Sequence, residues 1–184
     1  AHKNDEDFEP DGTWFSMIAL GRALYPMDSN HGELDRVTPN GRIRRVVDIS
    51  ARLGHAVPTA LVSRHGRFSV GNLGLFGAPD GTAPNEHVWD ITRRGHVTVR
   101  ASGLEQVLGL AFRQGLLYAL EMSTTPGGPT PGTGALVRLH DGRPVQTIAS
   151  GLDFPTGVTV GPDGAFYVSD RGFGFGAGQG RILR

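Results

Sequence analysis

A short unit of sequence recurs along the chain, and this repetition limits the possible fold more than any other feature. The unit is clearest at residues 149–170, ASGLDFPTGVTVGPDGAFYVSD, where two runs of alternating apolar residues flank a GPDG sequence that favours a reverse turn. The same position of successive copies is held by Leu24, Phe68, Leu117 and Phe166, which are 44, 49 and 49 residues apart. Short strands and glycine turns repeated at this interval are typical of the blades of a β-propeller.

The repeat divides the chain into three complete blades and one incomplete blade. We expect the blades at approximately residues 14–50, 59–101, 108–149 and 157–184, after a polar lead-in at residues 1–13. The last blade has only three expected strands, at residues 157–160, 165–170 and 181–184. The sequence therefore predicts an all-β fold, a β-propeller of four-stranded antiparallel blades, of which this chain carries about 3.5 of six.

Several motifs carry a resemblance to a known family. GL-x-FPTG-x-x-x-GPDGA-x-YVSD spans residues 151–170, and VPTALV, VGNLG, ALEMS, TGALVRL and GRILR accompany it in order along the chain. Together they resemble the ScyD/ScyE family of propeller-like proteins, which is related to the NHL and SMP-30 groups. The resemblance implies the fold but no particular reaction, because the family's association with biosynthesis of the pigment scytonemin does not define one. Since family members are typically about twice as long, it also implies that the chain is the C-terminal half of a propeller.

An incomplete propeller predicts a partner. An open arc of blades leaves sheet faces and strand edges uncovered, and such edges promote association. We expect the N-terminal half of the propeller to cover them, as a separate chain or a further segment; a second copy of this chain is the alternative.

Composition excludes several classes of protein and suggests a location. Glycine accounts for 28 of the 184 residues, which fits many tight turns, and 18 basic residues balance 18 acidic ones. The even balance predicts neither a nucleic acid nor an anionic membrane as partner, and no apolar run approaches the roughly 18 residues of a membrane span. Without cysteine, no disulfide framework or thiolate metal site can form. Family resemblance implies an extracellular or periplasmic location.

The links between the second and third strands of a blade are the candidate binding surface. These links are rich in glycine and proline at residues 73–85, 123–134 and 171–180. In an antiparallel blade they emerge on the same face as the links between blades, and insertions gathered on one face often form the binding face of a repeat protein. We expect a small molecule, a glycan or a protein to bind there; the alternative is that each link is an ordinary solvated loop.

A polar residue ends the second strand of every blade, on that same face. These residues are Asp28, Asn72, Glu121 and Asp170, and nearby links add His31, His55, Glu105 and Asp153. Such groups could orient a polar ligand or hold a divalent cation such as Ca²⁺, with Glu121 and Asp170 as the possible ligands. The alternative is structural, because strand-end carboxylates and amides often accept hydrogen bonds from loop backbone and histidines often hydrogen-bond within the fold.

The sequence supports a binding protein more strongly than an enzyme. The resemblance to SMP-30-type lactonases implies metal ligands at the starts of the inner strands, where this chain has Ser16, Thr59, Leu108 and Thr156. Three hydroxyls and a leucine do not make a calcium or zinc site. No G-x-S-x-G elbow is present, and no catalytic residue is assigned. The leading interpretation is a binding propeller; the alternative is a metal-dependent lactonase-like hydrolase or a lyase.

Arginine recurs in the third strand of three blades. Arg36, Arg138 and Arg184 share this position, which is held by Asp90 in the second blade. We expect these arginines to pair with neighbouring carboxylates.

Overall fold

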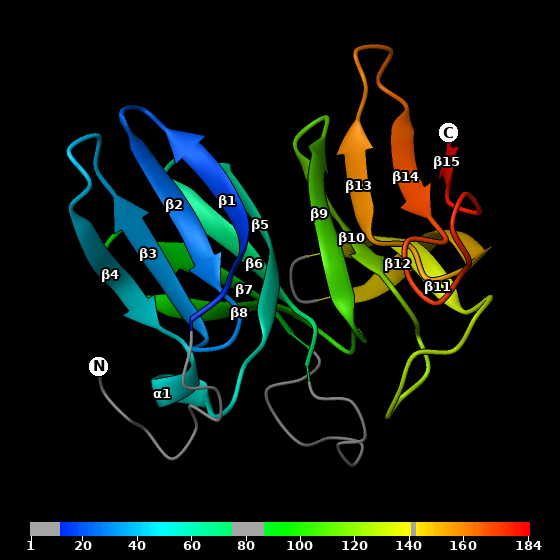
Figure 1. Cartoon of the computed structure of the whole chain (residues 1–184), viewed down its shortest axis with the longest axis horizontal. Coiled ribbons are helices and arrows are strands. Elements are labelled where there is room, and N and C mark those ends of the chain that lie inside the picture. Colours follow the sequence, from blue (N-terminus) through cyan, green and yellow to red (C-terminus); the bar gives the residue numbers. More distant parts are fainter. Residues whose placement is uncertain (1–11, 75–86, 141–142) are drawn as a thin grey trace.

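A computed structural model of the chain describes residues 12–74, 87–140 and 143–184. In these residues, four antiparallel sheets fan around a common axis as the blades of a propeller (Figure 1). Within each sheet, every strand pairs with its neighbour in the sequence. The predicted all-β propeller architecture is confirmed. The lead-in up to residue 11 and most of the link at residues 73–85 lie outside the described residues.

The strands of each blade run outward from the axis in chain order. Blade 1 comprises β1 (Trp14–Leu20), β2 (Ala23–Asp28), β3 (Glu33–Val37) and β4 (Ile43–Asp48). Blade 2 comprises β5 (Pro58–Arg64), β6 (Arg67–Asn72), β7 (His87–Thr92) and β8 (Val97–Ser102). Blade 3 comprises β9 (Val107–Arg113), β10 (Leu116–Glu121), β11 (Gly134–His140) and β12 (Arg143–Leu152). Blade 4 comprises β13 (Gly157–Val160), β14 (Phe166–Asp170) and β15 (Arg181–Leu183).

One short helix was not anticipated from the sequence. Helix α1 (Ser50–Leu53) lies in the link between blades 1 and 2. The Arg52 side chain at its end donates a hydrogen bond of 2.8 Å to the Gly95 carbonyl oxygen in the β7–β8 turn. The helix therefore ties the link to the outer part of blade 2.

Strand connections define two ends of the molecule. The described hairpins between the first and second strands, and between the third and fourth, lie at one end of their sheets, which we call the turn end. The described links after β2, β10 and β14 lie at the other end, with α1, and we call this the loop end (Figure 1).

Apolar side chains fill the spaces between neighbouring blades. Because blades 2 and 3 are covered on both faces, their strands are apolar on both faces: in β7, Trp89 packs toward blade 1 and Val88 toward blade 3. Tyr118 of blade 3 meets Phe166 of blade 4, with ring centroids 4.7 Å apart. Burial of large apolar side chains contributes about 2 kcal/mol each, so these layers hold the arc together.

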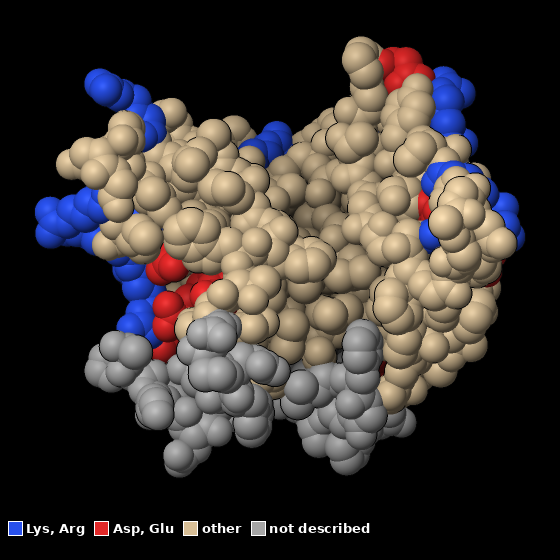
Figure 2. All heavy atoms as spheres, in the orientation of Figure 1, with Lys and Arg blue, Asp and Glu red and all other residues tan. Residues whose placement is uncertain are grey.

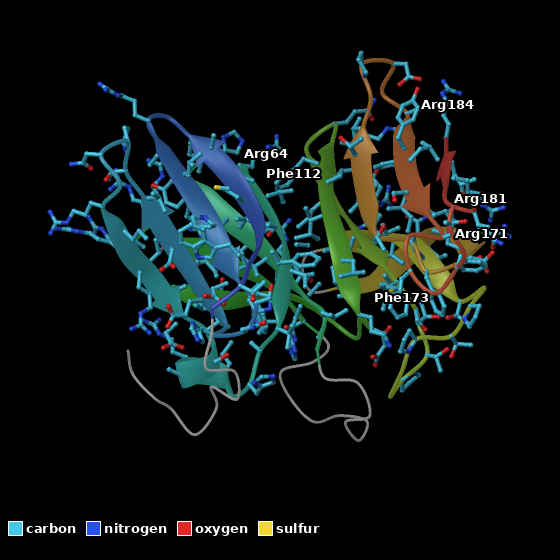
Figure 3. All side chains as sticks on the ribbon, in the orientation of Figure 1. Arg64, Phe112, Arg171, Phe173, Arg181 and Arg184 are labelled. Carbon is cyan, nitrogen blue, oxygen red and sulfur yellow. The ribbon has the colours of Figure 1, made fainter. Side chains whose placement is uncertain are left out.

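Polar contacts also cross from blade to blade. Near the loop end, the Ser29 hydroxyl donates to the Pro58 carbonyl oxygen at 2.6 Å, and the Thr59 hydroxyl donates to that of Val107 at 2.7 Å. Toward the turn end, the Arg64 guanidinium lies over the Phe112 ring of the next blade, 5.5 Å from its centroid (Figure 3). The seam between blades 2 and 3 is therefore fixed both near the loop end and toward the turn end.

Both outer limits of the arc are uncovered. Because Tyr25 and Met27 of β2 pack toward blade 2, the alternate residues face away from it. Among the described apolar side chains of blade 1 on that outward face, Met17 is 50 % exposed, Leu24 42 % and Ile43 53 %. At the other limit, β15 pairs with β14 on one side only, and Ile182 is 68 % exposed. No described helix is long and apolar enough to span a bilayer.

Candidate functional site

The polar residues at the second-strand ends have the same structural role in every blade. Asp28, Asn72, Glu121 and Asp170 are all buried. Each accepts a hydrogen bond from the backbone N–H of a residue just before the inner strand of its own blade. The donors are Thr13 to Asp28 at 3.0 Å, Val57 to Asn72 at 2.8 Å, Glu105 to Glu121 at 2.7 Å and Asp153 to Asp170 at 2.8 Å.

Backbone hydrogen bonds reinforce this contact. The residue after the second strand donates its N–H back to the same link: Ser29 to Thr13 at 3.0 Å, Leu73 to Val57 at 2.9 Å, Met122 to Gln106 at 2.9 Å and Arg171 to Asp153 at 2.7 Å. The side chain and backbone bonds together close the loop end of the first two strands, and we call this arrangement the blade clasp. Four repeats of one clasp account for the polar column in terms of structure.

The second oxygen of each clasp carboxylate has a different environment. In blade 1, Asp28 Oδ2 lies 3.3 Å from His31 Nδ1. In blade 4, Asp170 Oδ2 accepts from Arg181 Nε and Nη2 at 2.8 and 2.7 Å, which neutralises the carboxylate. Burial raises the pKa of the Glu121 carboxyl to about 7; the Glu105 N–H bond opposes the rise and the Glu105 charge adds to it. The Glu121 carboxyl can therefore exchange a proton near neutral pH.

The candidate site residues are brought together within blades. The structure joins Asp28 with His31, Glu105 with Glu121, and Asp153 with Asp170. His55 is half-buried in the link before β5, two residues from the Val57 donor. In the described part of the chain, no three His, Asp or Glu side chains are arranged to hold a metal ion.

The positions that hold the metal in the lactonase resemblance do not fit one here. The Thr59 hydroxyl is used in its bond to Val107, and the Thr156 hydroxyl lies 3.1 Å from that of Ser169. Ser16 Oγ is buried and has no hydrogen-bond partner in the described residues, while Leu108 brings no oxygen. A single available hydroxyl and no carboxylate is a poor donor set for a divalent cation.

Two of the loop-end links are each supported by one buried residue with positive φ. Beneath residues 123–134, Gln106 has φ of 47° and its Nε2 donates to the Thr125 carbonyl oxygen at 3.3 Å. Beneath residues 171–180, Phe154 has φ of 45° and packs against Phe173 and Phe175, with centroid distances of 5.7 and 6.2 Å. The same backbone position thus supports a polar link in blade 3 and an aromatic one in blade 4.

Ionic contacts fix the blade 4 link further. Arg171 donates to Asp153 Oδ2 from Nε and Nη2, both at 3.2 Å, and its guanidinium lies 5.0 Å from the Phe175 centroid. Phe173 remains 56 % exposed at the surface of this link (Figure 3). The link is therefore a defined structure that presents an aromatic side chain at the loop end.

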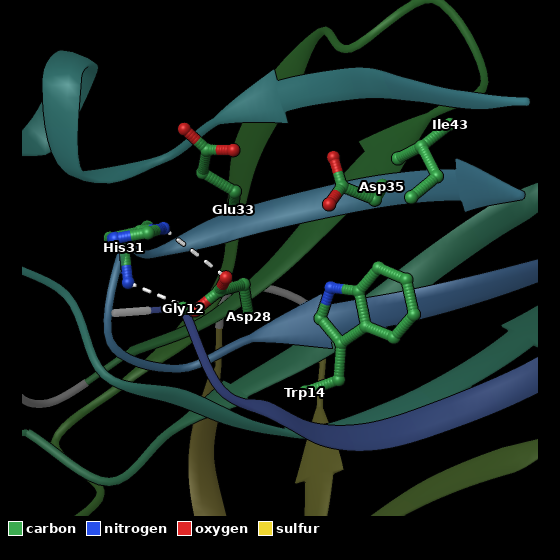
Figure 4. Close-up of a pocket in the computed structure, with 7 residues that line it drawn as sticks. All are labelled: Gly12, Trp14, Asp28, His31, Glu33, Asp35 and Ile43. Atoms are coloured by element: carbon green, nitrogen blue, oxygen red, sulfur yellow. Dashed lines mark hydrogen bonds and ion pairs between the residues drawn. The ribbon is translucent and has the colours of Figure 1, made fainter. Parts of the chain in front are cut away.

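A hollow on the outward face of blade 1 was missed by sequence reasoning. It has a volume of about 470 Å³ and is lined by Gly12, Trp14, Asp28, His31, Glu33, Asp35 and Ile43 (Figure 4). Burial raises the pKa of Glu33 to about 7 against the lowering effect of Arg45, and burial also raises the pKa of Asp35. Three carboxyl groups beside an indole suit a cationic group. Strand alternation was the available signal, since Glu33 and Asp35 are two residues apart in β3 and so share one face.

The fold and this loop end place the chain in the β-propeller class. No family model matches the chain, and no curated protein matches it in sequence. Solved structures resemble it in fold: a chain of a nidogen–laminin complex is 17 % identical, with a TM-score of 0.61, over 82 % of this chain and 52 % of that one. The XC5397 gluconolactonase from Xanthomonas campestris is 22 % identical, with a TM-score of 0.60, over 80 % of this chain and 52 % of that one.

A third structure, a putative gluconolactonase, is 15 % identical, with a TM-score of 0.57, over 80 % of this chain and 53 % of that one. At these identities the similarity establishes the fold alone. The chain spans about half the length of each of these three structures.

Proposed function

We propose that the chain belongs to a ligand- or partner-binding β-propeller of the ScyD/ScyE type, whose binding face is formed by the loop-end links. The observation that carries the proposal is the exposed Phe173 ring, held above the buried Phe154 ring while the polar column beneath is occupied by the blade clasps. A rigidly held aromatic suits the face of a sugar ring or an apolar side chain of a protein. The ligand is a small molecule, a glycan or a protein, in an extracellular or periplasmic setting.

The proposed binding is tested by probing the whole protein on an array of immobilised neutral oligosaccharides. Phe173→Ser is expected to abolish binding to the oligosaccharides that the native protein retains. Phe15, which is also 56 % exposed but lies in β1, provides a matched control. Binding that survives Phe173→Ser and is lost in Phe15→Ser would contradict the proposal.

We also propose that further blades, in a separate chain or another segment, complete the propeller. The outward apolar side chains of blade 1 and the unpaired edge of β15 support this, as does the chain's span of about half the similar structures. Native and denaturing mass spectrometry of the purified molecule test it. A monomer with the mass of this chain alone, stable in dilute solution, would contradict it.

A metal-dependent lactonase-like hydrolase, or a lyase, is the second candidate. One observation favours it: in blade 3, Gln106 Oε1 is buried without a hydrogen-bond partner in the described residues, and it lies in the same clasp as Glu121. Calorimetry with Ca²⁺, Mn²⁺ and Zn²⁺, followed by assays with gluconolactone, separates the two functions. Cation binding lost in Glu121→Ala or Asp170→Ala, together with lactone hydrolysis, would favour the enzyme.

A further inference from the structure

The turn end of blades 1 and 2 carries arginines whose guanidinium groups have no hydrogen-bond or ion-pair partner among the described residues. Besides Arg22 in the β1–β2 turn, they are Arg36, Arg42, Arg44, Arg67, Arg93 and Arg94, and we call these last six the arginine patch. All except the half-buried Arg36 are exposed, and the hydrogen bonds that Arg42 makes to Thr38 use its backbone and not its guanidinium group. Blue surface is visible at the turn end and the outer margin of blade 1 in Figure 2. The balanced charge of the whole chain conceals this local excess.

Like charges face one another across strands within the patch. Arg36 and Arg44 are paired opposite each other in the β3–β4 ladder. Arg67 is likewise opposite Arg64 in the β5–β6 ladder. Like charges directly opposite each other destabilise a sheet, so the fold retains these pairs against their local cost. The expectation that Arg36 pairs with a carboxylate is therefore wrong: its neighbour Asp35 lies on the other face of β3, opposite Arg45.

The two blades bring their arginines to one seam. Arg36 and Arg44 continue the face of Leu34 and Val47, which pack toward blade 2. The β7–β8 turn, which carries Arg93 and Arg94, contacts blade 1 there. Its Gly95 packs so closely against the Val46 carbonyl oxygen that a Cβ atom on residue 95 would clash. Gly66 lies in the β5–β6 turn, next to Arg67. The Arg93 side chain reaches this turn, because its Nε is 3.9 Å from the position that a Cβ atom on Gly66 would occupy. The patch is thus continuous across the seam.

The turns that carry the patch hold no acidic residue. Residues 36–44, 64–67 and 92–96 contain neither Asp nor Glu. In blades 3 and 4 the corresponding described arginines are engaged: Arg138 donates to His140, Arg184 pairs with Asp163, and Arg113 lies over Phe166. Unsatisfied positive charge is therefore a property of the blade 1 and 2 turns.

We propose that the arginine patch binds an anionic polysaccharide that carries carboxylate groups along its length. The guanidinium fork matches a carboxylate in two hydrogen bonds, and all but one of the 18 basic residues of the chain are arginine. Charges spread over two blades suit a ligand whose charges repeat, because linked contacts reinforce one another. The same turns offer Asn40, Thr92 and His96 to hydroxyl groups.

A single-stranded nucleic acid fits the patch less well. Its binding requires aromatic side chains on which bases stack. The turn segments at residues 36–44, 64–67 and 92–96 contain no Phe, Tyr or Trp. The polysaccharide is therefore the occupant that the surface favours, and nucleic acid is an outcome of the test.

The test measures binding of the whole protein to fluorescently labelled polygalacturonate oligomers by anisotropy. Binding is expected at low salt and weakens as salt is added, since exposed charges are screened. The triple variant Arg44→Gln, Arg93→Gln, Arg94→Gln is expected to bind at least about tenfold more weakly, from three lost exposed ion pairs. An uncharged dextran of similar length is expected not to bind.

A matched triple variant removes the same charge from arginines that have partners. It carries Arg138→Gln, Arg171→Gln and Arg184→Gln, and is expected to bind polygalacturonate like the native protein. Thermal unfolding verifies that both triple variants fold. If the patch triple variant does not fold, the binding measurement is made with Arg94→Gln alone. Three results would overturn the proposal: no binding at low salt, equal loss in both triple variants, or tighter binding of single- or double-stranded DNA of matched charge.

Discussion

The loop end and the turn end of this propeller use charged residues in opposite ways. At the loop end, Asp170 is buried and bonded to a backbone N–H and to Arg181. At the turn end, Arg44 is exposed, its guanidinium group has no partner in the described part of the chain, and it faces another arginine. Buried, satisfied polar groups hold a structure together, whereas exposed, unsatisfied charges of one sign are available to a partner. The comparison separates residues that build the blades from residues that can bind.

The largest predicted effect is a loss of stability in Asp170→Ala. The substitution leaves the Asp153 N–H without its acceptor and removes the partner of Arg181. We expect the free energy of unfolding to fall by about 3 kcal/mol, measured by urea denaturation. Asp170→Asn is the control, because its side-chain oxygen can still accept from Asp153, so its loss should be smaller.

A turn-end substitution sharpens the contrast. Arg94→Gln should change the free energy of unfolding by no more than about 0.5 kcal/mol, since the exposed side chain contacts no described partner. If Arg94→Gln destabilised the protein as much as Asp170→Ala, the distinction between the two ends would fail.

The architecture and the clasp column were predictable because both repeat. Alternating apolar residues and glycine turns recur in every blade, so the spacing of Leu24, Phe68, Leu117 and Phe166 was sufficient to place the strands. The same spacing identified the polar column, and the structural alternative stated for it describes the hydrogen bonds that these residues make. Repetition allowed prediction because one role in one blade implied the same role in the others.

Features that depend on one blade alone were not predictable. The Arg36 position suggested pairing with a carboxylate, which holds for Arg184 and Asp163 but not for Arg36, because β-register places Arg44 opposite it. The hollow that includes Glu33 and Asp35 depends on the outward face of blade 1 being uncovered. Register and the presence of a neighbouring blade are set by tertiary structure, so one blade's sequence does not reveal them.

A further prediction concerns Glu121, whose pKa in the folded protein is raised to about 7 from an ordinary value of 4.5. Between these values the folded state retains a proton that the unfolded state has released, so stability should fall as pH rises, and the full loss is reached above about pH 7. Glu121→Gln removes the titration and keeps an acceptor for the Glu105 N–H, as the amide of Asn72 does in blade 2. We expect the variant to be more stable than the native protein at pH 8 by about 2 kcal/mol.

Urea denaturation at pH 5 and pH 8 measures this difference. The native protein should lose stability between the two values, and Glu121→Gln should lose less. Glu121→Ala is the matched variant that removes both the titration and the acceptor, so it should be less stable than Glu121→Gln at either pH. Identical pH dependence in the native protein and Glu121→Gln would show that the clasp carboxyl is not buried as the structure indicates.

The smallest predicted effect has the opposite sign and is the most direct test of the turn end. Arg44→Gln relieves the repulsion from Arg36 and should raise the free energy of unfolding by about 0.3 kcal/mol at low salt, and by less at high salt. Arg45→Gln, one residue along the same strand, removes ion pairs with Glu33 and Asp48 and should lower it by about 0.5 kcal/mol. Denaturation of Arg44→Gln and Arg45→Gln is measured at two salt concentrations. Adding Arg36→Gln and the double variant Arg36→Gln, Arg44→Gln gives the coupling energy between Arg36 and Arg44. A destabilised Arg44→Gln would mean that this arginine has a structural role, and the turn end would then resemble the loop end.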